Sequence, residues 1–350
     1  MLKEGMLGVM GGQLIVKWVM KNKVQILTGI VFSLLFSSCR EKDVIPIVEL
    51  HPQKSIEVLS DSSLFSKVRR MKAYQGDIFI TEVGRGQILR LDADLNLKNT
   101  IGGKGNGPTE MVEMEGLDIS GDTIAVFDVG NARIQFYDLS GKHLGAIPFR
   151  DLPIGNKWDL SFCAGEIVCN NSRIALDSAF VRMSVKDTSD KAFFGRLDRF
   201  DSEMQTYIRN GHFFFEDGEW LWAVSDNLPF LDRYDRFGNH VERYDFSQLP
   251  VIKDAIAYVQ IQQKKTNSYA TLINGACFDS ERKRMYLLCN SWIEGEFFRN
   301  RILVLDLSSG KIQPECVWKL PDDVYRTMCL VGDKLYVFNG SRCLIERFGV

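Results

Sequence analysis

Two stretches of this chain carry the same pattern of residues, 46 positions apart. QGDIFITEVGRGQILRLDADLNLKNTI, residues 75–101, aligns with SGDTIAVFDVGNARIQFYDLSGKHLGAI, residues 120–147. The matched positions are Glu82 with Asp128, Gly84 with Gly130, Ile88 with Ile134 and Asp92 with Asp138. An internal repeat of this length limits the chain to architectures that stack copies of one unit or arrange them in a ring.

Weaker copies of the unit follow along the chain, beginning near Ala164, Asp217, Arg282 and Val331. In each copy a glycine or polar turn precedes alternating apolar residues, a polar corner and a second alternating run. Alternation with period two indicates half-buried antiparallel strands. Four such strands with their turns need roughly 40–50 residues, which is the length of one propeller blade.

Six units of this length fit into the 312 residues from Cys39 onward. The sequence therefore predicts an all-β fold, a six-bladed β-propeller of four-stranded antiparallel blades. The last copy has room for only three strands, so we expect an N-terminal strand, at 48–50 or 55–59, to close the last blade. Residues 252–263 alone suggest a helical period, and residues 149–209 fit the unit least well.

The N-terminal region has the layout of a secretory signal. A cationic segment at 20–23 precedes the apolar run 24–36 and then Ser37, Ser38 and Cys39. About a dozen apolar residues suit the core of a signal and fall short of the roughly 20 that span a bilayer; a buried strand or helix is the alternative. We expect a signal region at 1–38, with Met20 as the true start, and a single propeller domain at 39–350.

The sequence LLFSSC, residues 34–39, resembles the lipobox of bacterial lipoproteins, with Phe36 where that family prefers leucine. The resemblance implies that Cys39 is diacylated and becomes the mature N-terminus. The following CREKD, residues 39–43, resembles the signal that sends lipoproteins of Bacteroidetes to the cell surface.

GKGNGPTEM, followed by GLDISGDTIAVFDVGNARIQFYDLSGKHL, resembles an NHL repeat with its glycine-rich loop, its D-x-x-N-x-R-I corner and its final turn. Together with the lipobox, the chain resembles the NHL-like six-bladed β-propeller lipoproteins of Bacteroidetes. This implies a protein lipid-anchored to the outer membrane, on its periplasmic face or at the cell surface. The likeness is sharpest over residues 75–148.

The glycine-rich stretch GGKGNGPTE, residues 102–110, has features of a phosphate-binding loop. Gly102 and Gly107 have the spacing of that motif, but Pro108 replaces its essential lysine, and a strand pattern follows where a helix should begin. We therefore interpret the stretch as a crossing between blades. LDADLN, residues 91–96, lacks the glycine and glutamate of a calcium loop and is interpreted as a hairpin turn.

The net charge bears on the class of partner, and the cysteine spacing bears on metal binding and disulfides. The formal net charge is −2, and the first 38 residues carry +3, which leaves −5 for the remainder. An acidic body argues against nucleic acid, and we expect a monomer. Seven cysteines remain after Cys39, without metal-binding spacing. We expect them to be reduced, a Cys163–Cys169 bridge across a hairpin being the alternative.

Residue patterns for catalysis are few. The four histidines are His51, His143, His212 and His240, and no zinc motif or nucleophile elbow occurs. No metal and no cofactor are therefore expected. Glu110, Glu113 and Glu115 cluster at the start of the second blade, where two carboxylates across a pocket could cleave a glycosidic bond. A solvated acidic rim is the plainer interpretation.

Propeller geometry places the loops between blades, and those between second and third strands, around one mouth of the central channel. The ligand-face candidates there are Arg69, Arg85, Lys104, Glu110, Glu113, Glu115, Arg133, Trp158, His212, Trp292, Arg326 and Arg342. Arginine, amide and aromatic groups suit sugars or short peptides, although Arg133 is as well placed to brace its blade. The leading hypothesis is a non-enzymatic binding or scaffold module for a glycan, peptide or envelope protein. A lyase or glycosidase that uses the carboxylates is the alternative.

Overall fold

The computed structural model describes residues 45–151, 157, 159–171, 173, 176–265, 271–293, 295–322 and 324–350. Residues Pro46–Val350 form one compact unit. Cys39 and the signal region predicted at 1–38 lie outside the described residues, so the statements made about them stay predictions. In the described part of the chain, no helix combines the length and apolar character needed to cross a membrane.

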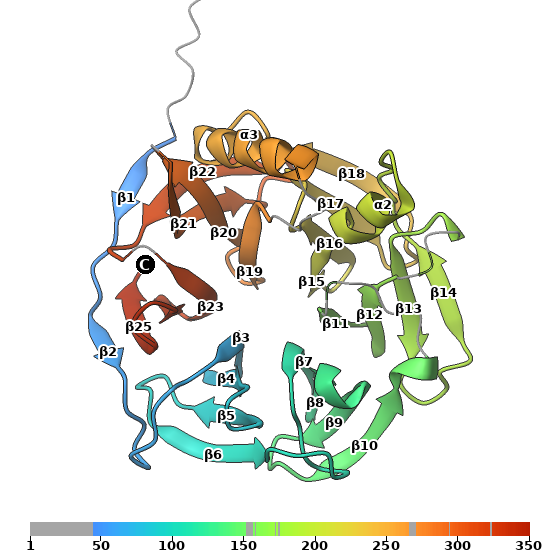
Figure 1. Ribbon diagram of the computed structural model, residues 1–350, viewed down its shortest axis with the longest axis vertical. Helices are drawn as coiled ribbons and strands as arrows, with labels where there is room; N and C mark the ends of the chain where they lie inside the picture. Colours follow the sequence, from blue (N-terminus) through green and yellow to red (C-terminus); the bar gives the residue numbers. More distant parts are fainter. Residues whose placement is uncertain are drawn as a thin grey trace, which may run out of the picture. The chain divides into compact units, whose positions relative to one another are not determined.

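Six sheets stand around a common axis, and in each of them the first strand lies innermost (Figure 1). Blade 1 contains β3 (Val68–Tyr74), β4 (Asp77–Glu82), β5 (Gln87–Leu91) and β6 (Leu97–Gly102). Blade 2 contains β7 (Met114–Ser120), β8 (Thr123–Asp128), β9 (Arg133–Asp138) and β10 (His143–Pro148). Blade 3 contains β11 (Leu160–Cys163), β12 (Glu166–Asn170), β13 (Phe180–Ser184) and β14 (Lys191–Phe194).

Blade 4 contains β15 (His212–Asp217), β16 (Trp220–Ser225), β17 (Phe230–Asp235) and β18 (His240–Asp245). Blade 5 contains β19 (Ile273–Asp279), β20 (Arg284–Ile293), β21 (Glu296–Asp306) and β22 (Gln313–Lys319). Blade 6 contains β23 (Tyr325–Val331), β24 (Lys334–Asn339) and β25 (Leu344–Gly349). The predicted all-β, six-bladed fold is confirmed, and the poorly matching stretch 149–209 holds blade 3.

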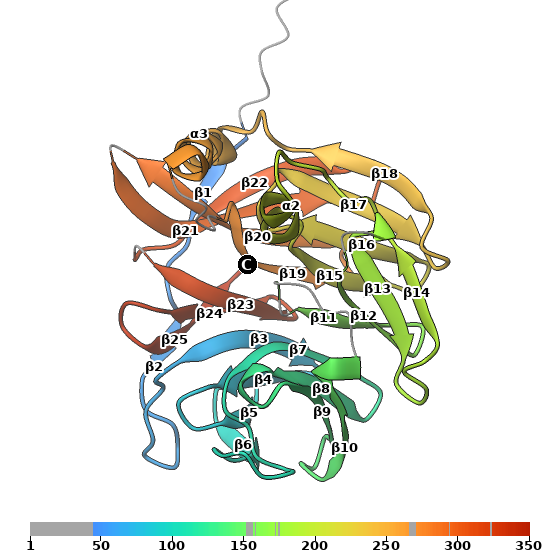
Figure 2. The ribbon, with the colours of Figure 1, turned by 45° about the vertical axis from the view of Figure 1, so that its right-hand side comes forward.

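The N-terminal part of the propeller closes the ring. Strand β2 (Lys54–Ile56) pairs antiparallel with β25 and supplies the fourth strand of blade 6, as predicted. Strand β1 (Ile47–Glu49) pairs parallel with β22 and becomes a fifth strand of blade 5. Figure 2 shows both blue strands along the outer edges of these two blades. The two candidate closing segments therefore serve two different blades.

The second strands are buried on both faces, which differs from the half-buried strands that the alternation predicted. All six residues of β4 are buried. Ile78 and Ile80 pack with side chains of blade 6, whereas Phe79 packs with side chains of blade 2. A blade lies between two neighbours, so its two faces both need apolar residues. The apolar core is consequently divided into layers between adjacent blades.

One buried polar position recurs at or near the end of every second strand. Its occupants are Glu82, Asp128, Asn170, Ser225, Asn290 and Asn339, none of them more than 2% exposed. Glu82 accepts backbone N–H bonds from Ser66 and Lys67, in the loop that leads into blade 1. Burial alone would raise the pKa of Glu82, but these hydrogen bonds lower it. We call these six residues the brace positions.

Asp128 shows the same arrangement in blade 2. One carboxylate oxygen accepts the N–H of Val112, in the loop that leads into the blade. The other accepts from the side chains of Asn131, Arg133 and Gln135. A buried backbone N–H without an acceptor costs about 1–3 kcal/mol, so Glu82 and Asp128 stabilise the loops that lead into blades 1 and 2.

Among the described residues, two helices lie in connections between blades (Figure 1). Helix α3 (Pro250–Lys265) contains the stretch 252–263 that the sequence singled out. Helix α2 (Glu203–Arg209) was not predicted, because seven residues are too few to display a helical period. Ser202 caps α2 by accepting the N–H of Gln205. Two 3₁₀ turns, η1 (Val129–Asn131) and η2 (Phe149–Asp151), flank blade 2 strands.

The cysteines within the propeller carry free thiols. Across the β11–β12 hairpin, Cys163 lies opposite Glu166 and Cys169 lies opposite Leu160. The two cysteines therefore do not face each other, and the alternative of a bridge across this hairpin does not fit the observed register.

Replacing Asp128 by Ala should lower the free energy of unfolding by about 3 kcal/mol, because it removes a fully buried carboxylate that accepts the Val112 N–H and bonds from three neighbouring side chains. Urea unfolding at pH 7 measures the change. Asp138→Ala is the matched control, since Asp138 accepts N–H bonds from Ser140 and Lys142 in a solvent-accessible turn. Similar losses in both variants would contradict the role of the brace position.

Candidate functional site

The mouth face is the face of the ring at which each first strand begins and each second strand ends. Antiparallel pairing brings the loops between blades and the loops between second and third strands to this face. Examples are residues 83–86, 103–113, 129–132, 195–211 and 340–343. The mouth face is the one on which the sequence placed the ligand-face candidates.

A cavity of about 300 Å³ opens on the mouth face where the first strands begin. Its lining comes from five blades and consists of Val68, Arg69, Arg70, Glu115, Lys157, Asn274, Arg299 and Arg326. Five of these side chains are cationic, one is a carboxylate and one is apolar. A concave site with convergent polar groups is the default candidate for ligand binding in a protein.

Three of the five cations are paired with carboxylates at N–O distances of 3.1–3.3 Å. The pairs are Arg69 with Glu113 and Glu115, Arg70 with Asp159, and Lys157 with Asp226. Burial raises the pKa of Asp159, and the positive charges of Arg70 and Lys157 oppose that shift. These three cations are therefore largely neutralised within the protein.

An aromatic ring supports the same cations. The Arg70 guanidinium carbon lies 5.0 Å from the ring centroid of Phe213, and the Lys157 ammonium lies 4.1 Å from it. Cation–π contacts of this kind attract the charged group to the face of the ring and so hold the side chain in place. Blade 4 thus contributes to the site through Phe213, beneath the charged groups.

Arg299 and Arg326 are arranged differently from the other cations. The Arg299 Nε donates to the amide oxygen of Asn290 at 2.7 Å, and Asn290 is a brace position. Burial and then the charge of Arg326 lower the pKa of Arg299 to about 10. Within the described ranges, neither arginine lies within ion-pair distance of a carboxylate.

Of the predicted site residues, Arg69, Glu115 and Arg326 line the cavity. Glu113 lies beside it, because its carboxylate binds both Lys67, at 2.7 Å, and Arg69. The hydrogen bond from Lys67 lowers the pKa of Glu113. The structure thus brings four of the twelve candidates together around one cavity.

Three further candidates belong to the crossing between blades 1 and 2. The Arg133 guanidinium donates to the carbonyls of Gly107 and Glu110, each at 2.7 Å. Glu110 accepts the N–H of Gly107, and Lys104 donates to the carbonyl of Gly84. The glycine-rich stretch 102–110 is therefore held by its own side chains and by the corner of blade 2.

Three further candidates are not part of the cavity lining. Arg85 pairs with Asp61, Arg342 pairs with Asp322, and the Trp292 ring stacks on Tyr258 of α3 with 3.7 Å between centroids.

His212 and Trp158 complete the set of candidates. The His212 side chain is fully buried, with its Nδ1 2.9 Å from the carbonyl of Asn210, and burial lowers its pKa. It packs edge-on against Phe180 and is not available to a ligand in this structure. Trp158 lies outside the described residues.

Sequence reasoning missed Arg70, Lys157, Asn274 and Arg299. For Lys157 a signal was present, since it lies thirteen positions before the brace residue Asn170. The same spacing relates Arg69 to Glu82, Glu115 to Asp128, His212 to Ser225 and Arg326 to Asn339. The other three residues depend on local irregularities of their strands.

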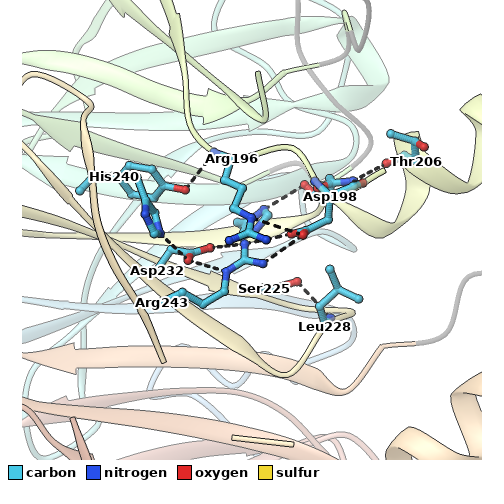
Figure 3. Close-up of polar contacts among 11 residues, drawn as sticks. Arg196, Asp198, Thr206, Ser225, Leu228, Asp232, His240 and Arg243 are labelled. Atoms are coloured by element: carbon cyan, nitrogen blue, oxygen red, sulfur yellow. Dashed lines mark hydrogen bonds and ion pairs between the residues drawn. The ribbon is translucent and has the colours of Figure 1, made fainter. Parts of the chain in front are cut away.

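A second polar cluster ties the connection before α2 to blade 4. Figure 3 shows the Arg243 guanidinium between the carboxylates of Asp198 and Asp232, with His240 on the far side of Asp232. Arg243 donates two bonds to each carboxylate, at 2.7–3.0 Å, and the His240 Nε2 lies 3.0 Å from Asp232. Every group in this cluster is engaged with another, so it serves as a structural tie.

Groups of three or more histidine, cysteine or acidic side chains placed to hold a metal ion are not found among the described residues.

Comparison with known proteins agrees with the architecture. A family model described as a 6-bladed beta-propeller matches residues 58–166. No curated protein matches the chain in sequence.

Several solved structures share the fold. A Bacteroides fragilis protein that is described as exported is 13% identical, with a TM-score of 0.56, covering 86% of this chain and 98% of that one. A member of the DUF4221 family from Bacteroides vulgatus is 11% identical, with a TM-score of 0.56 and coverage of 86% and 97%. A catalytically inactive virginiamycin B lyase from Staphylococcus aureus, with quinupristin, is 10% identical, with a TM-score of 0.50 and coverage of 85% and 98%. At these identities the likeness shows the fold alone.

The cluster of hydrogen bonds around Asp232 should make the free energy of unfolding depend on pH. Burial would raise the pKa of Asp232, but the bonds from Arg243 and His240 lower it. Its stabilisation is therefore present above the unfolded-state pKa of about 3.9 and is lost as the pH falls through the lower folded-state value. Asp232→Asn should cost roughly 3 kcal/mol at pH 7, and the cost should shrink below about pH 4.

Urea unfolding of both proteins between pH 7 and pH 2.5 measures this difference. Asp254→Asn, on the exposed side of α3, is the control and should match the wild type throughout. A cost for Asp232→Asn that stays constant down to pH 2.5 would refute the explanation.

Proposed function

We propose that this protein is an exported, lipid-anchored propeller that binds a ligand in the cavity of the mouth face. The cavity of about 300 Å³, with side chains converging from five blades, is the observation that carries the proposal. The partner is a glycan, a peptide or an envelope protein. An acidic body of −5 outside the first 38 residues weighs against nucleic acid.

The proposed location rests on the N-terminal sequence and on a structural likeness. LLFSSC ends in Cys39, the residue that would carry the lipid, and the anchor would place the propeller at the outer membrane. The similar Bacteroides fragilis protein, described as exported, supports an extracytoplasmic role. Membership of the NHL-like lipoproteins of Bacteroidetes is part of the same proposal and is supported by the corner formed by Asp128, Asn131 and Arg133.

Binding is favoured over catalysis by the state of Glu113 and Glu115, the two predicted carboxylates at the cavity. A glycosidase needs one carboxylic acid with a raised pKa to protonate the leaving group. Glu113 has a lowered pKa because Lys67 donates a hydrogen bond to it. Glu115 is paired with Arg69. Two ionised carboxylates that are held by cations are suited to positioning polar side chains. They are poorly suited to donating a proton.

Arrays of oligosaccharides and short peptides test the binding role. The wild type should retain at least one ligand, and Arg69→Gln should reduce retention because Arg69 lies at the cavity between two carboxylates. Arg282→Gln is the matched control, since Arg282 also pairs with a carboxylate, Asp279, but in the hairpin turn of the opposite face. Mass spectrometry should recover the ligand unchanged.

Two results would count against this proposal. Equal retention by the wild type and Arg69→Gln would place binding elsewhere. Cleavage of the ligand that disappears in Glu115→Gln would establish the enzymatic alternative.

The lipid anchor is tested by metabolic labelling with a palmitate analogue in a bacterial host. The full chain should incorporate the label and fractionate with membranes, whereas Cys39→Ala should do neither. Cys343→Ala, which removes a partly exposed thiol of the propeller, is the control and should label normally. Unchanged labelling of Cys39→Ala would exclude Cys39 as the acylated residue.

A further inference from the structure

We propose that Arg299 and Arg326 form an oxyanion-binding pair that receives the carboxylate or sulfate of an acidic sugar. This rests on the proposed function, because it assumes that the cavity binds a ligand, and it adds the chemical class of that ligand.

The first step is the imbalance of charge within the cavity. Arg69, Arg70 and Lys157 each have a carboxylate partner. In the part of the chain that the structure describes, Arg299 and Arg326 have none. Two guanidinium groups that share a concave surface repel each other, and an anion bound between them would relieve that repulsion.

The second step is the orientation of Arg299. Its Nε is occupied by the Asn290 oxygen, at 2.7 Å, and its guanidinium carbon lies 5.2 Å from the ring centroid of Phe297. These contacts fix the plane of the group, while the described residues offer its two terminal nitrogens no acceptor. A guanidinium held in this way is preorganised for a bidentate contact with an oxyanion.

The third step is the position of Arg326. It is exposed at the start of β23, and a Cβ atom added at Gly340 would lie only 2.6 Å from its Nε. The backbone of Gly340 is not in the left-handed region, so its conformation does not require glycine. Glycine is instead needed because a Cβ atom here would collide with the Arg326 side chain. The absence of a Cβ at position 340 leaves room for Arg326 to lie across the start of the loop 340–343 beside the cavity.

The fourth step concerns the rest of the ligand. Val68 is the one apolar residue of the lining, so the cavity offers no apolar pocket for the side chains of a peptide. Arg69, Glu115, Lys157 and Asn274 instead provide charged and amide groups that suit ring hydroxyls. A volume of about 300 Å³ is small for a ligand pocket, which favours one sugar residue of a longer chain.

The experiment compares charged ligands with neutral ones of the same shape. Tetragalacturonate and a sulfated heparin tetrasaccharide are the acidic probes, methyl-esterified tetragalacturonate is the neutral probe, and hexaglutamate is the peptide probe. Isothermal titration calorimetry of the full propeller measures each affinity at low and high salt. At least one acidic saccharide should bind, more weakly as salt increases, and the neutral ester should bind at least tenfold more weakly, on the order of one lost charge-assisted bond.

Arg299→Gln and Arg326→Gln should each weaken that binding by about tenfold or more. Gly340→Ala keeps both charges but displaces Arg326, and it should weaken binding in the same direction. Arg85→Gln, which changes an arginine paired with Asp61 outside the cavity, should bind as the wild type does. Circular dichroism and thermal unfolding of each variant identify any that fail to fold.

The outcomes separate this inference from the proposed function. Binding of neither acidic saccharide, or binding that the two arginine variants leave unchanged, overturns the oxyanion pair. Retention of a neutral glycan in the cavity would then still support a binding module. Arginine-dependent binding of hexaglutamate alone would overturn the sugar class, and failure of every array ligand would overturn the proposed function itself.

Discussion

A buried polar side chain at the end of each second strand is the interaction on which this structure depends. The blades bury apolar residues on both faces, so backbone groups in the loops that lead into them need partners within the protein. The brace residue supplies these in blades 1 and 2, as Asp128 does for Val112, and Asn170 of blade 3 accepts the N–H of His212 at the start of blade 4. In blade 5 the brace residue also holds a side chain of the cavity, because Asn290 binds Arg299. The same position thus secures the fold and orients the site.

The repeat determines where backbone positions lie around the cavity, but it does not determine which side chains occupy them. Counting thirteen residues back from five of the brace positions leads to Arg69, Glu115, Lys157, His212 and Arg326. Four of them lie at the beginning of a first strand and Lys157 lies shortly before β11, but their charges differ. A propeller ring can therefore change its ligand through substitutions at this register while keeping its layers of apolar packing, which is why the fold alone does not identify the function.

The sequence was sufficient for the number of blades because turn residues and period-two alternation recur in each unit. It was insufficient for the side chains whose direction depends on irregular pairing. Arg69 and Arg70 both line the cavity because a shift of register between Val68 and Met71 inserts an extra residue into β3. In β15 the register is continuous, so His212 is buried and Phe213 takes the place beneath the cations. Arg299 comes from the long β20–β21 hairpin, which departs from the length of the repeat.

The placement of β1 and β2 has a mechanical consequence. A force applied to the chain ahead of Ile47 would act along the direction of β1. The hydrogen bonds between β1 and β22 would then be loaded in shear and would break together rather than one at a time. If β1 detached from β22, the force would act next on β2, which pairs with β25 and closes blade 6. A force applied at the N-terminal end of the propeller would therefore meet the β1–β22 pairing before the β2–β25 pairing that joins the ring.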